Sequence, residues 1–278
     1  MIALLLALGS SLAYGCADFL GGLGSRKAHV LRTVLIAAPA SLAVELLLWP
    51  VLGATFSPGA VGWGAASGVA SAAAFALLYR TLAIGPMNVL SPVTALVSAA
   101  LPVGVGLLQG EQLSTAGIVG LPLALLAVVL VSAGPGTGAA RPSRAALLLA
   151  FGAGAAIALQ LVCLHQAPTD SGVAPLIVGR AVSSAVTLAA AGLLRRRLGS
   201  ERPAYAMSAG AGVLDSVANL LFLLAARSGD LTVVAVITAL YPASTVLLAR
   251  AVLGERIHRG QLAGLGVAAL AVSLLALA

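Results

Sequence analysis

The sequence predicts an all-α integral membrane protein of ten transmembrane helices, arranged as two inverted five-helix repeats. Three observations support this fold class. Hydrophobic residues make up 60% of the 278 residues and charged residues 8%, too few polar side chains to cover a soluble globule. Charges, Pro and Gly divide the chain into apolar segments of about 20 residues, the length that crosses a hydrocarbon core. The second half of the sequence also repeats the first.

Each half of the chain divides into five apolar segments. The predicted spans are 2–23, 31–49, 60–79, 87–108 and 113–133, then 145–165, 172–194, 204–226, 231–249 and 260–278. A stretch rich in turn formers around Gly134-Pro135-Gly136 separates the halves. We therefore expect a first repeat at 1–135, a linker at 136–144 and a second repeat at 145–278. Because five is odd, the second repeat enters the bilayer from the opposite side.

The internal repeat is clearest at a charged step, because Gly110-Glu111 returns as Gly254-Glu255 at an offset of 144. The same offset, without gaps, pairs Gly68 with Gly212, Gly85 with Gly229, Thr94-Ala95-Leu96 with Thr238-Ala239-Leu240, and Gly120-Leu121 with Gly264-Leu265. A charged step inside an apolar chain seldom recurs in register by chance. The period is that of a duplicated membrane module.

Basic residues mark one side of the predicted bundle. The loops after the odd-numbered spans and the adjoining helix ends hold Arg26, Lys27, Arg32, Arg80, Arg141, Arg144, Arg195, Arg196, Arg197, Arg202, Arg250, Arg256 and Arg259. The other side holds only Arg227. The positive-inside rule places the odd loops in the cytoplasm and both termini outside. The formal charge of +7 therefore reports orientation, and we expect a multi-pass protein of the cell inner (plasma) membrane with no nucleic-acid partner.

The end of each fourth span carries a family pattern. A small-residue helix with a central Pro, a Gly-Glu turn and a Gly-rich fifth helix occur at Pro102, Gly110-Glu111-Gln112 and Gly117, and again at Pro242, Gly254-Glu255-Arg256 and Gly264. The opening stretch Tyr14-Gly15-Cys16-Ala17-Asp18-Phe19 looks like a first-helix signature. In these features the chain resembles the EamA family of the drug/metabolite transporter (DMT) superfamily along nearly its whole length.

The resemblance implies a secondary transporter, often an exporter of metabolites, amino acids or drugs, that works by alternating access. We expect proton-coupled export of a small organic metabolite, amino acid-like or drug-like. The alternatives are an uncoupled facilitator of the same fold and a membrane-embedded enzyme. The enzyme is disfavoured because the sequence has no Ser/His/Asp set, metal cluster or phosphate-cradling motif. The expected partners are a small-molecule substrate, protons and the lipid bilayer, with no cofactor. A monomer is expected because one chain holds both halves.

Ionisable residues inside spans are the sharpest candidates for a site, because a charge at the bilayer centre costs at least about 3 kcal/mol. Asp215 lies near the middle of its span, with Asn219 one turn later on the same face. We expect Asp215 to contact substrate or a proton, and the alternative is a structural hydrogen bond between helices. Arg180 either binds an anionic group or forms a fixed ion pair with Asp215 or Glu45.

Other candidates lie nearer the ends of their spans. Asp18 is close to the predicted cytoplasmic end of the first span, where proton coupling, a gate and helix-end packing are alternatives. Tyr14 and Tyr241 are candidates for the walls of a cavity, or for packing. Glu45, beside Trp49, is expected to extend to the outer interface.

Two further sets of residues have structural or no expected roles. Glu111 and Glu255 are expected to cap helix ends, because a carboxylate there can accept backbone N–H groups and interact favourably with the helix dipole. The histidines, His29, His165 and His258, are too scattered for a metal site. No metal is expected.

Overall fold

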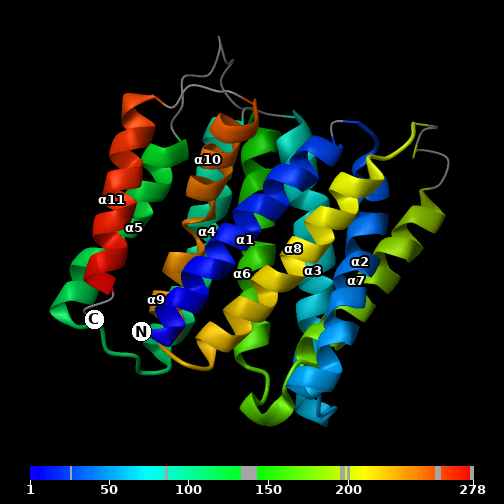
Figure 1. Cartoon of the computed structure of the whole chain (residues 1–278), viewed down its shortest axis with the longest axis horizontal. Coiled ribbons are helices and arrows are strands. Elements are labelled where there is room, and N and C mark those ends of the chain that lie inside the picture. Colours follow the sequence, from blue (N-terminus) through cyan, green and yellow to red (C-terminus); the bar gives the residue numbers. More distant parts are fainter. Residues whose placement is uncertain are drawn as a thin grey trace.

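A computed structural model describes residues 1–25, 27–84, 87–132, 143–194, 198, 201–253 and 258–275. Within these ranges the chain is helical, with one isolated bridge between Ala54 and Gly172. The helices are α1 (Ile2–Ser25), α2 (Val30–Leu52), α3 (Pro58–Ile84), α4 (Met87–Leu108), α5 (Thr115–Ser132), α6 (Arg144–His165), α7 (Ala174–Leu193), α8 (Tyr205–Ala226), α9 (Leu231–Thr238), α10 (Tyr241–Leu253) and α11 (Arg259–Leu275), with a 3-10 turn at Thr169–Ser171. They form one bundle (Figure 1). Of the predicted linker, only Ser143 and Arg144 are described.

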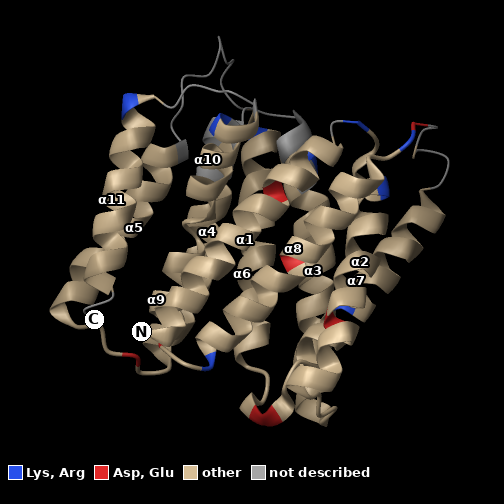
Figure 2. Cartoon of the chain, viewed as in Figure 1, with Lys and Arg blue, Asp and Glu red and all other residues tan. Residues whose placement is uncertain are grey.

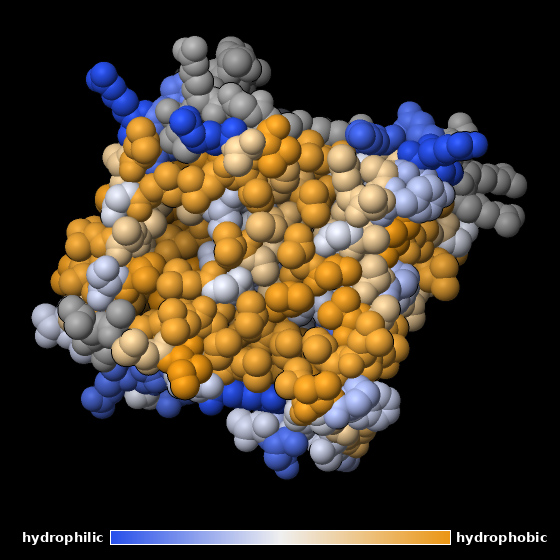
Figure 3. Space-filling model, viewed as in Figure 1, coloured by the Kyte–Doolittle hydropathy of each residue, from blue (hydrophilic) through white to orange (hydrophobic). Residues whose placement is uncertain are grey.

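The length and apolar character of the helices fit a bilayer. Seven candidate membrane spans can be recognised among the described residues, one of which runs through α9 and α10. Shorter apolar helical segments occupy Val93–Leu108, Thr115–Val131 and Arg259–Leu275. A broad apolar belt covers the visible face between two polar rims (Figure 3), and most of the described Lys and Arg residues lie at one end of the bundle (Figure 2). The chain is a multi-pass, all-helical membrane protein.

Helices form here because lipid offers the backbone no hydrogen-bond partners, so each segment must satisfy its own N–H and C=O groups. Polar side chains follow the same rule. The Thr94 hydroxyl donates to the Leu90 carbonyl at 3.1 Å and the Thr187 hydroxyl to the Ser183 carbonyl at 2.8 Å. At the start of α6, the Ser143 side chain accepts from the Ala146 N–H at 3.1 Å, which caps the helix.

The ninth predicted span is two helices rather than one. α9 ends at Thr238 and α10 begins at Tyr241, with Pro242 in the first turn of α10. Proline is tolerated there because the first turn leaves its N–H groups without intrahelical partners. The interruption between α9 and α10 lies beside the cavity described below, which Thr238, Ala239 and Tyr241 line.

The helices of the first half pack mainly against helices of the second half. The most extensive contacts join α1 with α8, α3 with α6 and α7, α4 with α6, α2 with α8, and α5 with α11. Contacts between neighbouring helices of one half, such as α1 with α2 or α2 with α3, are much smaller. Neither half therefore has a core of its own, and residues from both halves meet at the centre of the bundle.

Close approach of these helices depends on small residues. A Cβ at Gly68 of α3 would clash with the carbonyl of Gly179 on α7, and a Cβ at Gly212 of α8 would clash with the carbonyl of Ala37 on α2. Glycine lets the two backbones touch, which is how helices associate where lipid gives no hydrophobic drive. These crossings bring α2, α3, α7 and α8 together around the buried charges.

Candidate functional site

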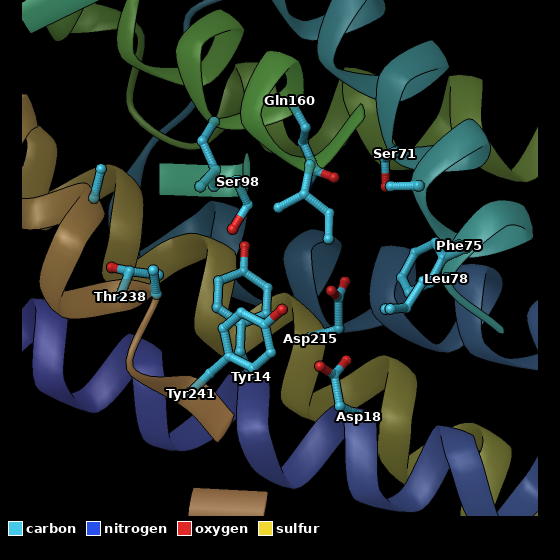
Figure 4. A pocket seen from close by; sticks show the side chains of 15 residues that line it. Tyr14, Asp18, Ser71, Phe75, Leu78, Ser98, Gln160, Asp215, Thr238 and Tyr241 are labelled. Carbon is cyan, nitrogen blue, oxygen red and sulfur yellow. The ribbon is translucent and has the colours of Figure 1, made fainter. Parts of the chain in front are cut away.

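A cavity lies inside the bundle between α1, α3, α4, α6, α8, α9 and α10. Its polar lining residues are Tyr14, Asp18, Ser71, Ser98, Gln160, Asp215, Thr238 and Tyr241. In Figure 4, Asp18, Asp215 and the two tyrosines lie together on one side, and Gln160 and Ser71 lie across from them. Arg180 and Asn219 border a smaller adjoining pocket, which shares Ser71 and Gln160 with the cavity.

Arg180 is the centre of a buried charge network. The residue is 3% exposed, and its guanidinium is ion-paired with the carboxylate of Asp215. Its Nε lies 3.5 Å from Oε1 of Glu45, and its Nη1 donates to Ser71 Oγ at 2.9 Å. The guanidinium also lies over the ring of Phe75, 5.7 Å from the ring centre. α7 carries this cation, and three other helices, α2, α3 and α8, supply its partners.

A chain of amides continues this network toward α6. Gln160 Nε2 donates to Asn219 Oδ1 at 2.6 Å, and Asn219 Nδ2 donates to the backbone carbonyl of Asp215 at 2.8 Å. On the other side, Ser216 Oγ donates to Glu45 Oε1 at 3.2 Å. Asn219 shares a helix face with Asp215, as its spacing predicts, but its side chain holds the backbone of Asp215 and does not line the main cavity.

Asp18 faces the cavity without a protein partner. No described residue donates a hydrogen bond to its carboxylate or forms an ion pair with it. Two hydroxyl groups on the same side of the cavity, those of Tyr14 and Tyr241, are buried and also lack hydrogen-bond partners in the described structure. The buried hydroxyl of Thr238, farther from Asp18 on the cavity wall (Figure 4), also lacks one. This side of the cavity has donors and acceptors that the described protein atoms leave unused.

The buried carboxylates are staggered across the bundle. Asp18 lies seven residues before the end of α1, and Glu45 lies seven residues before the end of α2, which runs in the opposite direction. At about 1.5 Å per residue, each is roughly 10 Å from an opposite end of the bundle. Asp215, near the middle of α8, lies between them in depth. The three acidic groups therefore lie at successive depths in the bundle interior.

Comparison with known proteins identifies part of this chain. Residues 144–277 match the sequence model of the EamA-like transporter family. These residues are an EamA-like transporter domain. The match confirms the family recognised from the sequence, and members of this family are membrane transporters of the drug/metabolite type. Nothing among the curated proteins matches the chain.

The fold of the whole chain has a solved counterpart. One crystal structure, described only as that of a protein, superimposes with a TM-score of 0.79 over 99% of this chain and 96% of its own, at 16% sequence identity. At that identity the likeness concerns the fold alone. It extends over both the EamA-like domain and the half that precedes it.

The expectation for Glu45 was wrong. Its side chain does not extend to the outer interface: the residue is 1% exposed and contacts Arg180 and Ser216. The physical reason is that a buried guanidinium is costly without an anionic partner, and Glu45 supplies one by turning inward to Arg180 instead of outward to water. The sequence did point to this contact in one way: Arg180, inside a span, requires a partner, and Glu45 was one of the two candidates.

Glu111 caps a helix, but one from the EamA-like domain rather than the adjacent α5. Its Oε1 accepts from the Leu231 N–H at 2.6 Å and its Oε2 from the Thr232 N–H at 2.9 Å, at the start of α9. The loop after α4 therefore fixes the N-terminus of the helix that lines the cavity. Glu255 lies outside the described residues.

Arg227 organises the loops at the end of the bundle opposite the basic rim. Its Nη1 donates to the Gly172 carbonyl at 2.9 Å, and its Nη2 donates to the Pro168 carbonyl at 3.0 Å and to Ser171 Oγ at 2.9 Å. Burial lowers the pKa of Arg227, and the nearby Asp170 carboxylate acts in the opposite direction. The same loop pairs with Gly53 through the Val173 N–H, which donates at 2.9 Å.

Sequence reasoning missed some lining residues and set others aside. Ser71, Ser98 and Thr238 were not singled out, because small hydroxyl residues in apolar helices are common and usually bond to their own backbone. The Thr238 repeat with Thr94 was the available signal. Within the described part of the chain, no group of three His, Cys, Asp or Glu side chains is placed to hold a metal ion.

Proposed function

We propose that this protein is a secondary transporter that exports a small organic metabolite in exchange for protons by alternating access. The observation that carries the proposal is Arg180, held by carboxylates from both halves of the chain beside a cavity that two acidic residues line. An intramembrane ion pair with an adjacent cavity is typical of substrate and proton pathways. The EamA-like domain supports the transporter class, and the buried charge network supports the proposed proton coupling.

Paired glycine contacts support ten spans in two inverted repeats, with the first at 1–135, the linker at 136–144 and the second at 145–278. Gly120 packs against Leu274 and Leu275, while Gly264, at the repeat offset of 144, packs against Leu130 and Val131, which are the equivalents of those leucines. A contact and its mirror are expected together when the two halves are related by a two-fold axis, so this pair supports the proposed inverted repeat. Alternating access in duplicated transporters uses such an axis.

A second pair of contacts supports the same symmetry nearer the site. Gly68 and Gly212 are related by the repeat offset, and each meets the second helix of the other half, at Gly179 and Ala37 respectively. Rocking one half against the other about these crossings would open the central cavity alternately to each side. We place the protein in the inner membrane, with the basic rim in the cytoplasm and both termini outside. One chain contains both halves, so the working unit is a monomer.

The proposed coupling step is an exchange at the ion pair. When Asp215 binds a proton it loses its charge, and its attraction to Arg180 falls. Arg180 then remains with Glu45, Ser71 and Phe75, and the ion pair that joins α7 to α8 is weakened. Substrate and proton occupy the acidic side of the cavity in turn, so that proton entry drives substrate exit. Asp18, Asp215 and Glu45 lie at successive depths in the bundle, so each carboxylate can bind the proton in turn along this path.

Reconstituted vesicles test the proposal. Purified protein is inserted into liposomes loaded with pools of amines, amino acids, nucleosides or sugars, and an imposed pH gradient is dissipated as one pool is exchanged. We expect Asp215→Asn to abolish proton-driven exchange and Asp170→Asn, at an exposed loop, to leave it intact. Exchange that ignores the gradient would establish the uncoupled facilitator instead. Intact coupling in Asp215→Asn would contradict the assigned proton site.

A further inference from the structure

Three carboxylates and one guanidinium meet inside the bundle: Asp18, Asp215 and Glu45 against Arg180. Arg180 is fully engaged by Glu45, Asp215 and Ser71. The interior therefore holds a formal excess of two negative charges. Such an excess is costly in a medium of low polarity unless a positive charge accompanies it.

The cavity carboxylate without a partner in the described structure is that of Asp18. Asp18 has no ion-pair or hydrogen-bond partner among the described residues, and it lines the cavity. Tyr241 and Thr238 are 6% and 3% exposed, and their hydroxyl groups lack protein partners. Figure 4 shows both on the cavity wall, and Tyr14 and Tyr241 on the same side of the cavity as Asp18. A carboxylate next to aromatic rings and free hydroxyl groups is suited to an ammonium group.

We infer that the transported solute is an organic amine that carries a net positive charge, with its ammonium group bound at Asp18 between Tyr14 and Tyr241. This inference rests on the proposed transport function and names its substrate class. The ammonium donates to the Asp18 carboxylate and to the tyrosine oxygens. The apolar part of the amine lies against Leu78, Ile157 and Leu161.

The same geometry disfavours amino acids. An α-carboxylate needs a cationic or strongly donating partner, and no Lys, Arg or His is found among the residues that line the cavity in the described structure. The nearest cation, Arg180, is already held by two acids. An amino acid would bring its carboxylate toward Asp18 and Asp215, where like charges repel. An amine of the same skeleton avoids this repulsion.

Pairs of compounds that differ only by the carboxylate test the inference. Phenethylamine and phenylalanine, isopentylamine and leucine, and cadaverine and lysine are titrated calorimetrically into the purified full-length protein in lipid nanodiscs at pH 7.5. We expect at least one amine to bind about tenfold or more tightly than its amino acid. Equal or tighter binding of the amino acids, or no measurable binding of any amine at millimolar concentration, would overturn the inference.

Variants locate the ammonium. Asp18→Asn should weaken amine binding by about tenfold or more, because the attraction to a full charge is lost. Asp18→Glu keeps the charge and should recover part of the affinity, and Asp170→Asn is the control acid on an exposed loop. A thermal unfolding scan of each variant shows that the fold is retained. Unchanged amine affinity in a folded Asp18→Asn protein would exclude this site.

Vesicle transport of the same compounds separates this inference from the proposed function. An amine that binds at Asp18, when neither it nor any other pooled solute is carried across the membrane, would refute transport and leave the ammonium-binding site standing. An amino acid that is exchanged for protons, with no amine binding, would refute the amine class and leave transport standing.

Discussion

The guanidinium of Arg180 on α7 is ion-paired with the carboxylate of Asp215 on α8, and both residues are buried. Glu45 reaches the same guanidinium from α2, in the first half of the chain. One buried cation thus links the two halves of the chain inside the bundle. Several of the following predictions test consequences of this relationship and of the packing around it.

Arg180→Gln should destabilise the protein strongly, because it leaves the carboxylates of Asp215 and Glu45 buried without a countercharge. Removing one partner of a buried ion pair costs about 3–5 kcal/mol. Thermal unfolding in detergent, followed by circular dichroism, measures the loss. The triple variant Arg180→Gln, Asp215→Asn and Glu45→Gln should recover most of it, since no charge then remains among the partners of Arg180. A triple variant as unstable as Arg180→Gln would show that the packing of the arginine, rather than its charge, matters.

Substitution of alanine at the glycine crossings should be costly. Gly68→Ala and Gly212→Ala each place a methyl group against a backbone carbonyl, and overpacking of this kind costs about 1–3 kcal/mol. Gly62 lies on α3 like Gly68 but has open space around it. Gly62→Ala should therefore be neutral or stabilise the helix by up to about 1 kcal/mol. Equal effects of Gly62→Ala and Gly68→Ala on unfolding would argue against a close crossing.

Arg227→Gln should release the loop at 168–173. The arginine donates three hydrogen bonds to Pro168, Ser171 and Gly172, and hydrogen bonds to a charged group contribute about 1.5–3 kcal/mol each. We expect faster hydrogen exchange at the amides of Ser171 and Val173, both of which donate within this loop region. Exchange in the middle of α8 serves as the internal control. Unchanged exchange at both amides would mean that the loop is held by its pairing with α2 alone.

Amine binding at Asp18 should depend on pH. A proton and an ammonium group compete for the same carboxylate, so affinity should fall as the pH is lowered, approaching tenfold per pH unit when competition is complete (about 1.4 kcal/mol). The charged and titratable groups that face Asp18 across the cavity or act through it are Tyr14, Tyr241, Asp215, Arg180 and Glu45.

Titration of the amine between pH 6 and pH 8 measures this dependence. Asp18→Asn should flatten it, because the group for which the proton competes is gone. A dependence that persists in Asp18→Asn and disappears in Asp215→Asn would move the competition to Asp215. Affinity that rises as the pH falls would contradict competition at either residue.

Much of the local structure follows from residues close in sequence. The apolar segments, the charges inside them and the shared face of Asp215 and Asn219 depend on length and on the helical period, which are local properties. The repeat of Gly110-Glu111 at Gly254-Glu255 is also visible without coordinates. The family match of residues 144–277 and the helical structure of the described residues confirmed the corresponding predictions.

The partners of the charged residues were decided by tertiary structure. Arg180 had Asp215 and Glu45 as alternatives in the sequence and contacts both, Glu45 turned inward, and Glu111 caps α9, 120 residues away in the chain. Helical periodicity determines which face of a helix a side chain occupies, but not which helix that face meets. In a bilayer, that choice depends on where small residues such as Gly68 and Gly212 allow two backbones to touch, and those contacts join distant parts of the sequence.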